Sequence, residues 1–138
     1  MALVYLSLGS NLGDRAQYLV NAKNFIQEDI GVIIAESSIY ENKAVGFDGN
    51  DFYNQVIKVE TNFFPEILLQ KIQKIEKMMG RKEKTVWQNE SPLYKNRVID
   101  IDILLYDDLQ INTKELTIPH PRMYERDFVL NLLNELMN

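Results

Sequence analysis

The segment from Arg97 to Asp107 constrains this chain more than any other part of it. It is a run of branched apolar residues interrupted by two acids, Asp100 and Asp102, and is typical of a buried β-strand. Side chains alternate between the faces of a strand, so the two carboxylates share one face, with Cα atoms roughly 6.5–7 Å apart. Two acids on so apolar a strand are costly to bury uncompensated. Bound metal, with Mg²⁺ favoured by the hard oxygen ligands, or a cluster of arginines would compensate them; two solvated acids are the alternative.

Length and composition predict one domain with no membrane-spanning helix. The chain has 138 residues, 46% of them apolar, and no cysteine. We therefore expect residues 1–138 to form a single domain with its own core. No apolar run approaches the roughly 18 residues of a spanning helix, and the alternating N-terminal stretch predicts a strand rather than a signal peptide. We expect a monomeric, cytoplasmic protein with no membrane partner.

The charge distribution points to a small anionic ligand. A net charge of −5 argues against a general nucleic-acid binder, which would present a basic surface. Eight of the 15 basic residues nevertheless lie between positions 71 and 97. A local basic patch on an acidic protein suits a nucleoside triphosphate. We interpret the helix lysines of this patch as a solvated face, and Arg81 and Arg97 as anion ligands.

The order of elements predicts an α+β fold. Strands are expected at 2–8, 32–40, 52–60 and 98–106, and helices from the cap Asp14 to Gly31 and from Pro65 to Gly80. A polar loop is expected at 81–96, a hairpin around Ile111 and Leu116, and a last helix at roughly 127–137. This is a ferredoxin-like βαββαβ antiparallel sheet with two helices on one face and a C-terminal hairpin and helix extension. The fold alone decides no function, because it hosts RNA-binding modules, small-molecule enzymes and polymerase palms.

Three further patterns are candidates for a site. Phe52 and Asn54 share strand parity, and an aromatic ring beside an amide suits a flat heteroaromatic ligand. Taken alone, the pair is better interpreted as a core Phe and a strand-end Asn. His120, the single histidine, lies between two prolines; it is either a packed residue or a fixed neutral donor for a phosphate oxygen. Trp87 in a charged loop suggests a lid or a stacking contact.

Six short motifs, in this order along nearly the whole chain, resemble one family. They are Gly9-Ser10-Asn11-Leu12, Phe52-Tyr53-Asn54, Glu76 with Gly80-Arg81, Arg97-x-x-Asp100-x-Asp102-Ile-Leu, Ile118-Pro-His120-Pro and Arg126-x-Phe128-Val-Leu. Together they resemble the 6-hydroxymethyl-7,8-dihydropterin pyrophosphokinases of folate biosynthesis. The resemblance implies transfer of the β,γ-pyrophosphoryl group of ATP to the hydroxymethyl oxygen of a reduced pterin, with release of AMP. Such a transfer needs positioning and charge neutralisation more than covalent help.

The resemblance also assigns roles by position. Two Mg²⁺ ions would be held by Asp100 and Asp102, which with Arg81 and Arg97 form the implied catalytic set. Phe52 and Phe128 would sandwich the pterin, and Asn54 would bind its edge together with backbone groups near Asn42 and Val45. Phosphate contacts would come from the two arginines, His120 and Arg126. The residues around the nucleoside would be Gln73, Glu76, Ile103 and Thr117.

The chain departs from the family pattern in the loop that should close over ATP. Glu83 stands where the family often has a second arginine, and the compact lid is stretched to Trp87 through Arg97. Either Trp87 or Tyr94 could supply the lid aromatic, and the chain stops soon after its last helix. Two other function classes stay open: a different Mg²⁺-dependent nucleotidyl or phosphoryl transferase, and a non-enzymatic binding module.

Overall fold

The computed structural model describes residues 1–42, 51–80, 86–88, 91–93 and 98–137. Its centre is an antiparallel sheet in the strand order β2 (Gly31–Glu36), β4 (Phe52–Thr61), β1 (Ala2–Ser10) and β7 (Asp100–Tyr106). A short strand, β3 (Tyr40–Asn42), pairs with the beginning of β4. Two small hairpins lie apart from this sheet: β5 (Val86–Gln88) with β6 (Ser91–Leu93), and β8 (Ile111–Asn112) with β9 (Thr117–Ile118).

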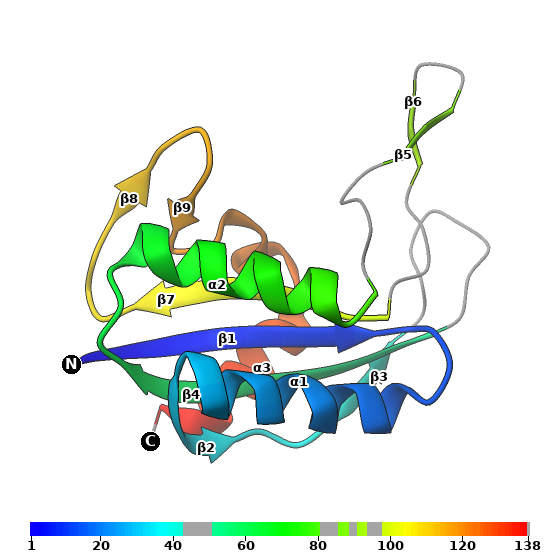
Figure 1. Cartoon of the computed structure of the whole chain (residues 1–138), viewed down its shortest axis with the longest axis horizontal. Coiled ribbons are helices and arrows are strands. Elements are labelled where there is room, and N and C mark those ends of the chain that lie inside the picture. Colours follow the sequence, from blue (N-terminus) through cyan, green and yellow to red (C-terminus); the bar gives the residue numbers. More distant parts are fainter. Residues whose placement is uncertain (43–50, 81–85, 89–90, 94–97, 138) are drawn as a thin grey trace.

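Helices cover both faces of the sheet (Figure 1). On one face lie α1 (Arg15–Asp29) and α2 (Pro65–Met78), side by side and packed on the larger core. On the other lie the 3₁₀ turn η1 (Pro121–Glu125) and α3 (Asp127–Leu136), packed on a smaller core. The central strand β1 is buried on both sides: Leu6 and Leu8 enter the larger core and Tyr5 the smaller. Burying each such side chain stabilises the fold by about 1.5–3 kcal/mol. None of the described helices is long and apolar enough to span a membrane.

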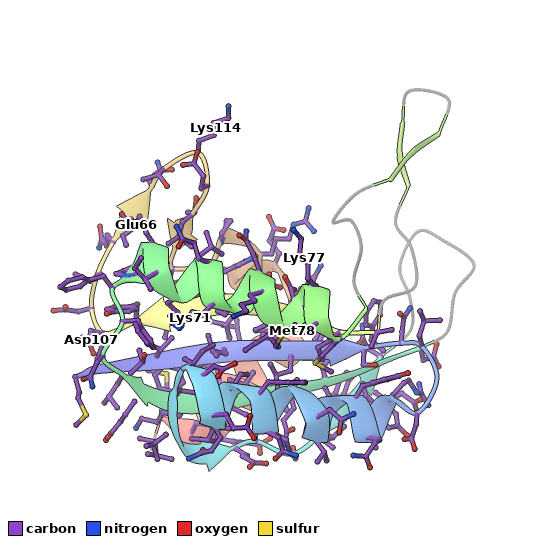
Figure 2. The ribbon with its side chains drawn as sticks, in the orientation of Figure 1. Glu66, Lys71, Lys77, Met78, Asp107 and Lys114 are labelled. Carbon is purple, nitrogen blue, oxygen red and sulfur yellow. The ribbon has the colours of Figure 1, made fainter. Side chains whose placement is uncertain are left out.

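Local signals explain the ends of the first two helices. The carboxylate of Asp14 accepts a hydrogen bond from Gln17 N at 3.1 Å and caps α1 as predicted. Pro65 occupies the first turn of α2, where its missing N–H costs nothing. Gly80 follows α2 with a φ of +103°, a left-handed conformation that favours glycine. The predicted solvated face of α2 is confirmed at Lys77, which projects into solvent, while Lys71 lies with Nζ 4.5 Å from the centroid of the Phe63 ring (Figure 2).

Two of the predicted boundaries are wrong. The strand expected at 32–40 is two strands, because the chain leaves the ladder at Ser37. There the hydroxyl Oγ of Ser37 accepts from Val56 N at 2.9 Å, replacing a backbone partner with a side chain. The polar loop expected at 81–96 contains the hairpin strands β5 and β6. The hairpin near Ile111 and the last helix are confirmed as β8–β9 and α3.

Candidate active site

One row of residues crosses the sheet on the face that carries α3. Asp100 on β7 pairs with Gly9 on β1, and Gly9 pairs with Asn54 on β4, which in turn pairs with Tyr40 on β3. Directly opposite one another, these residues share a face. Asp102 pairs with Ser7 one row further along and faces the same way. The acids and the predicted aromatic–amide pair therefore belong to one surface.

Gly9 keeps this surface open between Asp100 and Asn54. A Cβ built on Gly9 would lie 3.5 Å from Asn54 Oδ1 and 3.6 Å from Phe52 Cδ1. Phe52 and Asn54 thus border the space above the glycine. The absence of a side chain at this position leaves room for a flat ligand next to the carboxylate row.

The carboxylates suit a hard cation that retains other ligands. Asp100 is partly exposed and the side chain of Asp102 is 41% exposed; each also interacts with other groups. Within the described part of the chain, no three His, Cys, Asp or Glu residues gather as a closed metal cage. Mg²⁺ usually binds through one or two carboxylates and completes its shell with water and substrate phosphates, so this donor set fits it.

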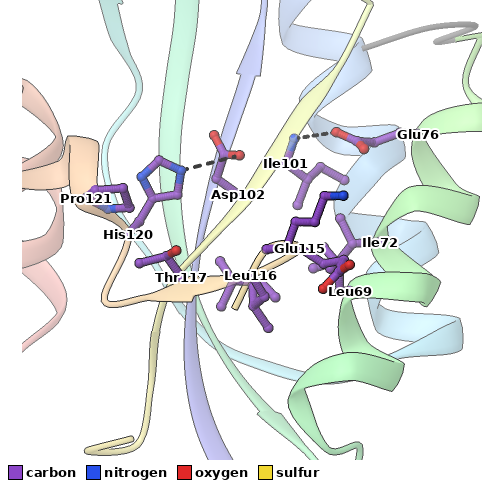
Figure 3. Close-up of a pocket in the computed structure, with 12 residues that line it drawn as sticks. Leu69, Ile72, Glu76, Ile101, Asp102, Glu115, Leu116, Thr117, His120 and Pro121 are labelled. Carbon is purple, nitrogen blue, oxygen red and sulfur yellow. Dashed lines mark hydrogen bonds and ion pairs between the residues drawn. The ribbon is translucent and has the colours of Figure 1, made fainter. Parts of the chain in front are cut away.

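A bulge in β7 places His120 beside Asp102. Tyr5 pairs with Leu105 and Leu6 with Ile103, so Leu104 is an extra residue in β7. Its carbonyl accepts from His120 N at 3.0 Å and ties the proline-flanked turn to the strand. Bulges commonly redirect groups next to functional sites. Nε2 of His120 then lies 3.8 Å from Oδ1 of Asp102 (Figure 3).

His120 is held as a neutral donor. Its Nδ1 accepts from Arg122 N at 3.1 Å, which assigns the ring proton to Nε2, the nitrogen facing Asp102. Burial, and then the charges of Arg126 and Arg122, lower the pKa of His120 below its usual 6.5. A neutral imidazole with an N–H aimed at the carboxylate edge could donate to a phosphate oxygen; that role stays a prediction.

A pocket of about 250 Å³ adjoins the carboxylates between α2, β7 and the β8–β9 hairpin. Of the residues assigned to the nucleoside, Glu76, Ile103 and Thr117 line it together with His120, whereas Gln73 is absent from its walls. Figure 3 shows Glu76 reaching from α2 to β7. Its side chain is almost fully buried, and Oε2 accepts from Ile101 N at 2.9 Å, between the two aspartates.

The sequence interpretation missed parts of this pocket. Lys114, Glu115 and Leu116, on the hairpin turn and at its end, line it as well. A two-residue hairpin strand carries too short a pattern to indicate which side chains it turns inward. Their inclusion follows from the docking of the hairpin against β7.

The aromatic half of the site includes a residue that was not predicted. Phe128, at the start of α3, stacks on Tyr40 with ring centroids 5.4 Å apart and an interplanar angle of 11°. Nδ2 of Asn54 donates to the carbonyl oxygen of Tyr40 at 3.2 Å and to Oδ1 of Asn42. These bonds turn the Asn54 carbonyl oxygen toward Gly9. The alternation of the β3–β4 pairing would have identified Tyr40, had the short strand been recognised.

Several of the residues predicted to form the site lie outside the part of the chain that the structure describes. Val45, Arg81 and Arg97 lie outside the described residues, as do the side chains of Trp87 and Tyr94. Arg126 is exposed immediately before α3, close enough to influence His120. Roles for all of these stay predictions.

The chain is similar to known proteins over nearly its whole length. Residues 5–138 match the family model described as 7,8-dihydro-6-hydroxymethylpterin-pyrophosphokinase (HPPK). A 2-amino-4-hydroxy-6-hydroxymethyldihydropteridine pyrophosphokinase of Aquifex aeolicus is 47% identical over 99% of this chain and 81% of its own length. The enzyme of the same name from Bacillus subtilis is 40% identical over 97% of this chain and 77% of its own.

Solved structures share the fold at lower identity. The wild-type HPPK-DHPS of Plasmodium falciparum with pteroate superposes with a TM-score of 0.72 at 18% identity, covering 96% of this chain. This chain spans 38% of the length of that protein. Because the family model spans residues 5–138 and these relatives align over 97–99% of this chain, the chain belongs to the 7,8-dihydro-6-hydroxymethylpterin-pyrophosphokinase family.

Proposed function

We propose that this chain transfers the β,γ-pyrophosphoryl group of ATP to the hydroxymethyl oxygen of 6-hydroxymethyl-7,8-dihydropterin, yielding AMP and the pterin diphosphate for folate biosynthesis. Family membership supports the reaction. The observation that supports assigning this reaction to particular residues is the row Asp100–Gly9–Asn54. This row joins the two carboxylates of β7 to the surface formed by Phe52 and Asn54. One substrate would lie over Gly9 and the other would reach it from the pocket beside Glu76.

The transfer exchanges one P–O bond for another. The hydroxymethyl oxygen forms a bond to the β-phosphorus, while the bond from that phosphorus to the α,β-bridging oxygen breaks and its electron pair leaves with AMP. The hydroxyl proton passes to water. Because little covalent help is needed, the protein contributes by alignment and by charge placed around the polyphosphate.

Asp100 and Asp102 would hold Mg²⁺, with two ions proposed. Bound there, the metal would neutralise phosphate charge and orient the oxygens, as divalent ions do in phosphoryl transfer. Beside it His120 would donate Nε2–H to a phosphate oxygen, and Arg126 would add positive charge. The sequence assigns the same task to Arg81 and Arg97.

On the pterin side, Phe52 would stack on the ring and Phe128 would close it from the α3 side. The Asn54 amide, with its N–H groups already bonded to β3, would present its oxygen to the donors of the pterin edge. Asn42 and Val45 complete the proposed subsite. Gln73, Glu76, Ile103 and Thr117 would surround the nucleoside.

We further propose that residues 1–138 form one ferredoxin-like domain that acts as a cytoplasmic monomer. The strand order β2-β4-β1-β7 with α1 and α2 on one face supports the topology. Neither nucleic acid nor membrane is proposed as a partner, given the net charge of −5.

Product analysis tests the reaction. The purified protein with ATP, Mg²⁺ and 6-hydroxymethyl-7,8-dihydropterin should form AMP and pterin diphosphate in equal amounts, resolved by ³¹P NMR or by chromatography. Omitting the pterin gives the background hydrolysis. Formation of ADP instead would indicate a phosphoryl kinase, and the absence of either product from folded protein would refute the proposal.

A further inference from the structure

Arg15 makes contacts that neither helix formation nor the core requires. It is the first residue of α1, where a cation meets the positive end of the helix dipole, and the cap is already supplied by Asp14. Its guanidinium reaches away from the helix to β3 and to the residue that precedes β4. Nη1 donates to Oε2 of Glu41 at 2.8 Å and to the carbonyl oxygen of Asp51 at 2.7 Å.

A third contact fixes the plane of the guanidinium. Its Cζ lies 3.9 Å from the centroid of the Tyr53 ring, a cation–π geometry. The Arg15 side chain is only 24% exposed, so solvent screens these contacts less than it would on an open surface. One side chain thus holds a helix end, β3 and the beginning of β4 together.

Each contact lies next to a residue of the proposed pterin site. Glu41 precedes Asn42, Asp51 precedes Phe52, and Tyr53 separates Phe52 from Asn54. Glu41 and Tyr53 pair across β3 and β4 and face α1, whereas their neighbours in the strands face the opposite side, toward the row of Asp100. Arg15 therefore contacts the face of the β3–β4 ladder that is turned toward α1. The predicted pterin ligands lie on the opposite face of the same ladder.

The ladder needs such support because it is short. β3 pairs with β4 over three residues, and eight residues in the sequence, 43–50, separate Asn42 from Asp51. Short ladders open easily, and a ligand that must order them binds more weakly. Charge-assisted hydrogen bonds from one guanidinium to both sides of the ladder hold its geometry before the ligand arrives.

We infer that Arg15 is a positioning residue for the pterin half of the site. This inference rests on the proposed function. It assigns to Arg15 no contact with either substrate: it aligns Asn42, Phe52 and Asn54 through Glu41, Asp51 and Tyr53. The ATP pocket, on the far side of β7, lies outside its reach.

The test compares Arg15→Gln with Lys23→Gln. Lys23 is a matched control, since it also reaches from α1 to a strand, pairing with Oε1 of Glu36 on β2 at 2.8 Å. Within the described part of the chain, this ion pair does not involve Asn42, Phe52 or Asn54. Calorimetry would give the Kd for the pterin and for α,β-methylene-ATP, and steady-state kinetics would give KM and kcat. Arg15→Gln should raise the pterin Kd and KM about five- to tenfold, the loss expected for one charge-assisted contact. The nucleotide Kd, and kcat at saturating pterin, should stay at the wild-type value.

Lys23→Gln should leave both Kd values unchanged. An unaltered pterin Kd in folded Arg15→Gln would overturn the inference, as would equal weakening of pterin and nucleotide binding. If Arg15→Gln does not fold, Glu41→Ala removes the acceptor of the Arg15–Glu41 contact from the other side, and normal pterin binding by that folded variant would also overturn the inference. Wild-type protein that binds no pterin refutes the proposed function instead, before any variant is considered.

Discussion

Gly9 offers a substitution whose effects on stability and on binding should have opposite signs. Its φ lies outside the left-handed region, and a Cβ at this position meets no atom closer than 3.5 Å. Gly9→Ala therefore fits the folded backbone without strain. Because alanine has fewer unfolded conformations to lose, the variant should be more stable by about 0.4–1 kcal/mol.

The same methyl group would occupy the space proposed for the pterin. It would project between Asp100 and Asn54, beside Phe52. Forcing a methyl into a close-packed contact typically costs about 1–3 kcal/mol. At about 1.4 kcal/mol for each factor of ten, the pterin should bind roughly 5- to 150-fold more weakly. Nucleotide affinity should not change, since the pocket lined by Glu76 lies on the other side of β7.

Thermal unfolding and a pterin titration on the same sample measure both effects. Gly31→Ala is the contrasting control, because its Cβ would lie 2.0 Å from the backbone oxygen of Glu60 and must disturb the β2–β4 pairing. That variant should lose stability and so lower Tm. Gly9→Ala that melts at or above the wild-type temperature yet binds pterin normally would show that the ligand does not lie over Gly9.

Three further substitutions test other parts of the structure. The carboxylate of Glu135 accepts hydrogen bonds from Ser38 N at 2.8 Å and Ser38 Oγ at 2.7 Å, and these bonds lower the pKa of Glu135 below its usual 4.5. The ionised carboxylate therefore stabilises the fold fully above pH 4.5. This stabilisation is lost as the pH falls through the lower pKa of the folded protein. The difference in urea midpoint between wild type and Glu135→Gln should accordingly shrink as the pH is lowered from neutral through the lowered pKa of Glu135, and a constant difference would contradict this. Tyr40→Ala should lose the stack on Phe128, worth about 0.5–1.5 kcal/mol, and weaken pterin binding, whereas Tyr40→Phe should behave as wild type in both assays. Glu76→Ala leaves a β7 amide without its acceptor and should lower the unfolding free energy in urea by about 1–3 kcal/mol, with a smaller loss in Glu76→Gln, whose amide oxygen can still accept.

Local patterns in the sequence were sufficient to predict most elements and the facing of single residues. Alternation placed Asp100 with Asp102, and Phe52 with Asn54, because the period of a strand is fixed by its backbone. The helix ends followed from a capping side chain and a glycine, whose effects extend over only a few residues. These features depend only on neighbouring residues and not on the rest of the fold.

What local patterns could not provide was the spatial relation between distant segments, which only the family resemblance implies. The two pairs meet on one surface because Gly9 pairs with Asp100 on one side and with Asn54 on the other, and this depends on strand order and register. The bulge at Leu104 that directs His120 toward Asp102 is likewise a property of pairing. The family resemblance implies a phosphate contact for His120, but its position 3.8 Å from Asp102 depends on this pairing.

Tyr40 illustrates the same limit at short range. It was expected at the end of one long strand, but the bond from Val56 N to the Ser37 hydroxyl ends β2 early and lets Tyr40 begin a new strand over Asn54. A serine whose hydroxyl replaces a backbone hydrogen-bond acceptor does not change the alternation of apolar and polar residues from which a strand is predicted. The aromatic neighbour of Phe128 therefore became visible only with the fold.

The most direct test of the account is AMP formation by Asp102→Asn beside the wild type. Each would receive ATP, Mg²⁺ and 6-hydroxymethyl-7,8-dihydropterin, with Tm and pterin Kd measured on the same preparations. Loss of a carboxylate charge from a partly exposed position should leave folding and pterin binding intact while AMP formation falls by about a thousandfold or more. Wild-type rates from the variant, or a loss of AMP formation explained by unfolding, would contradict the central claim that this face of β7 is where the metal and the polyphosphate meet.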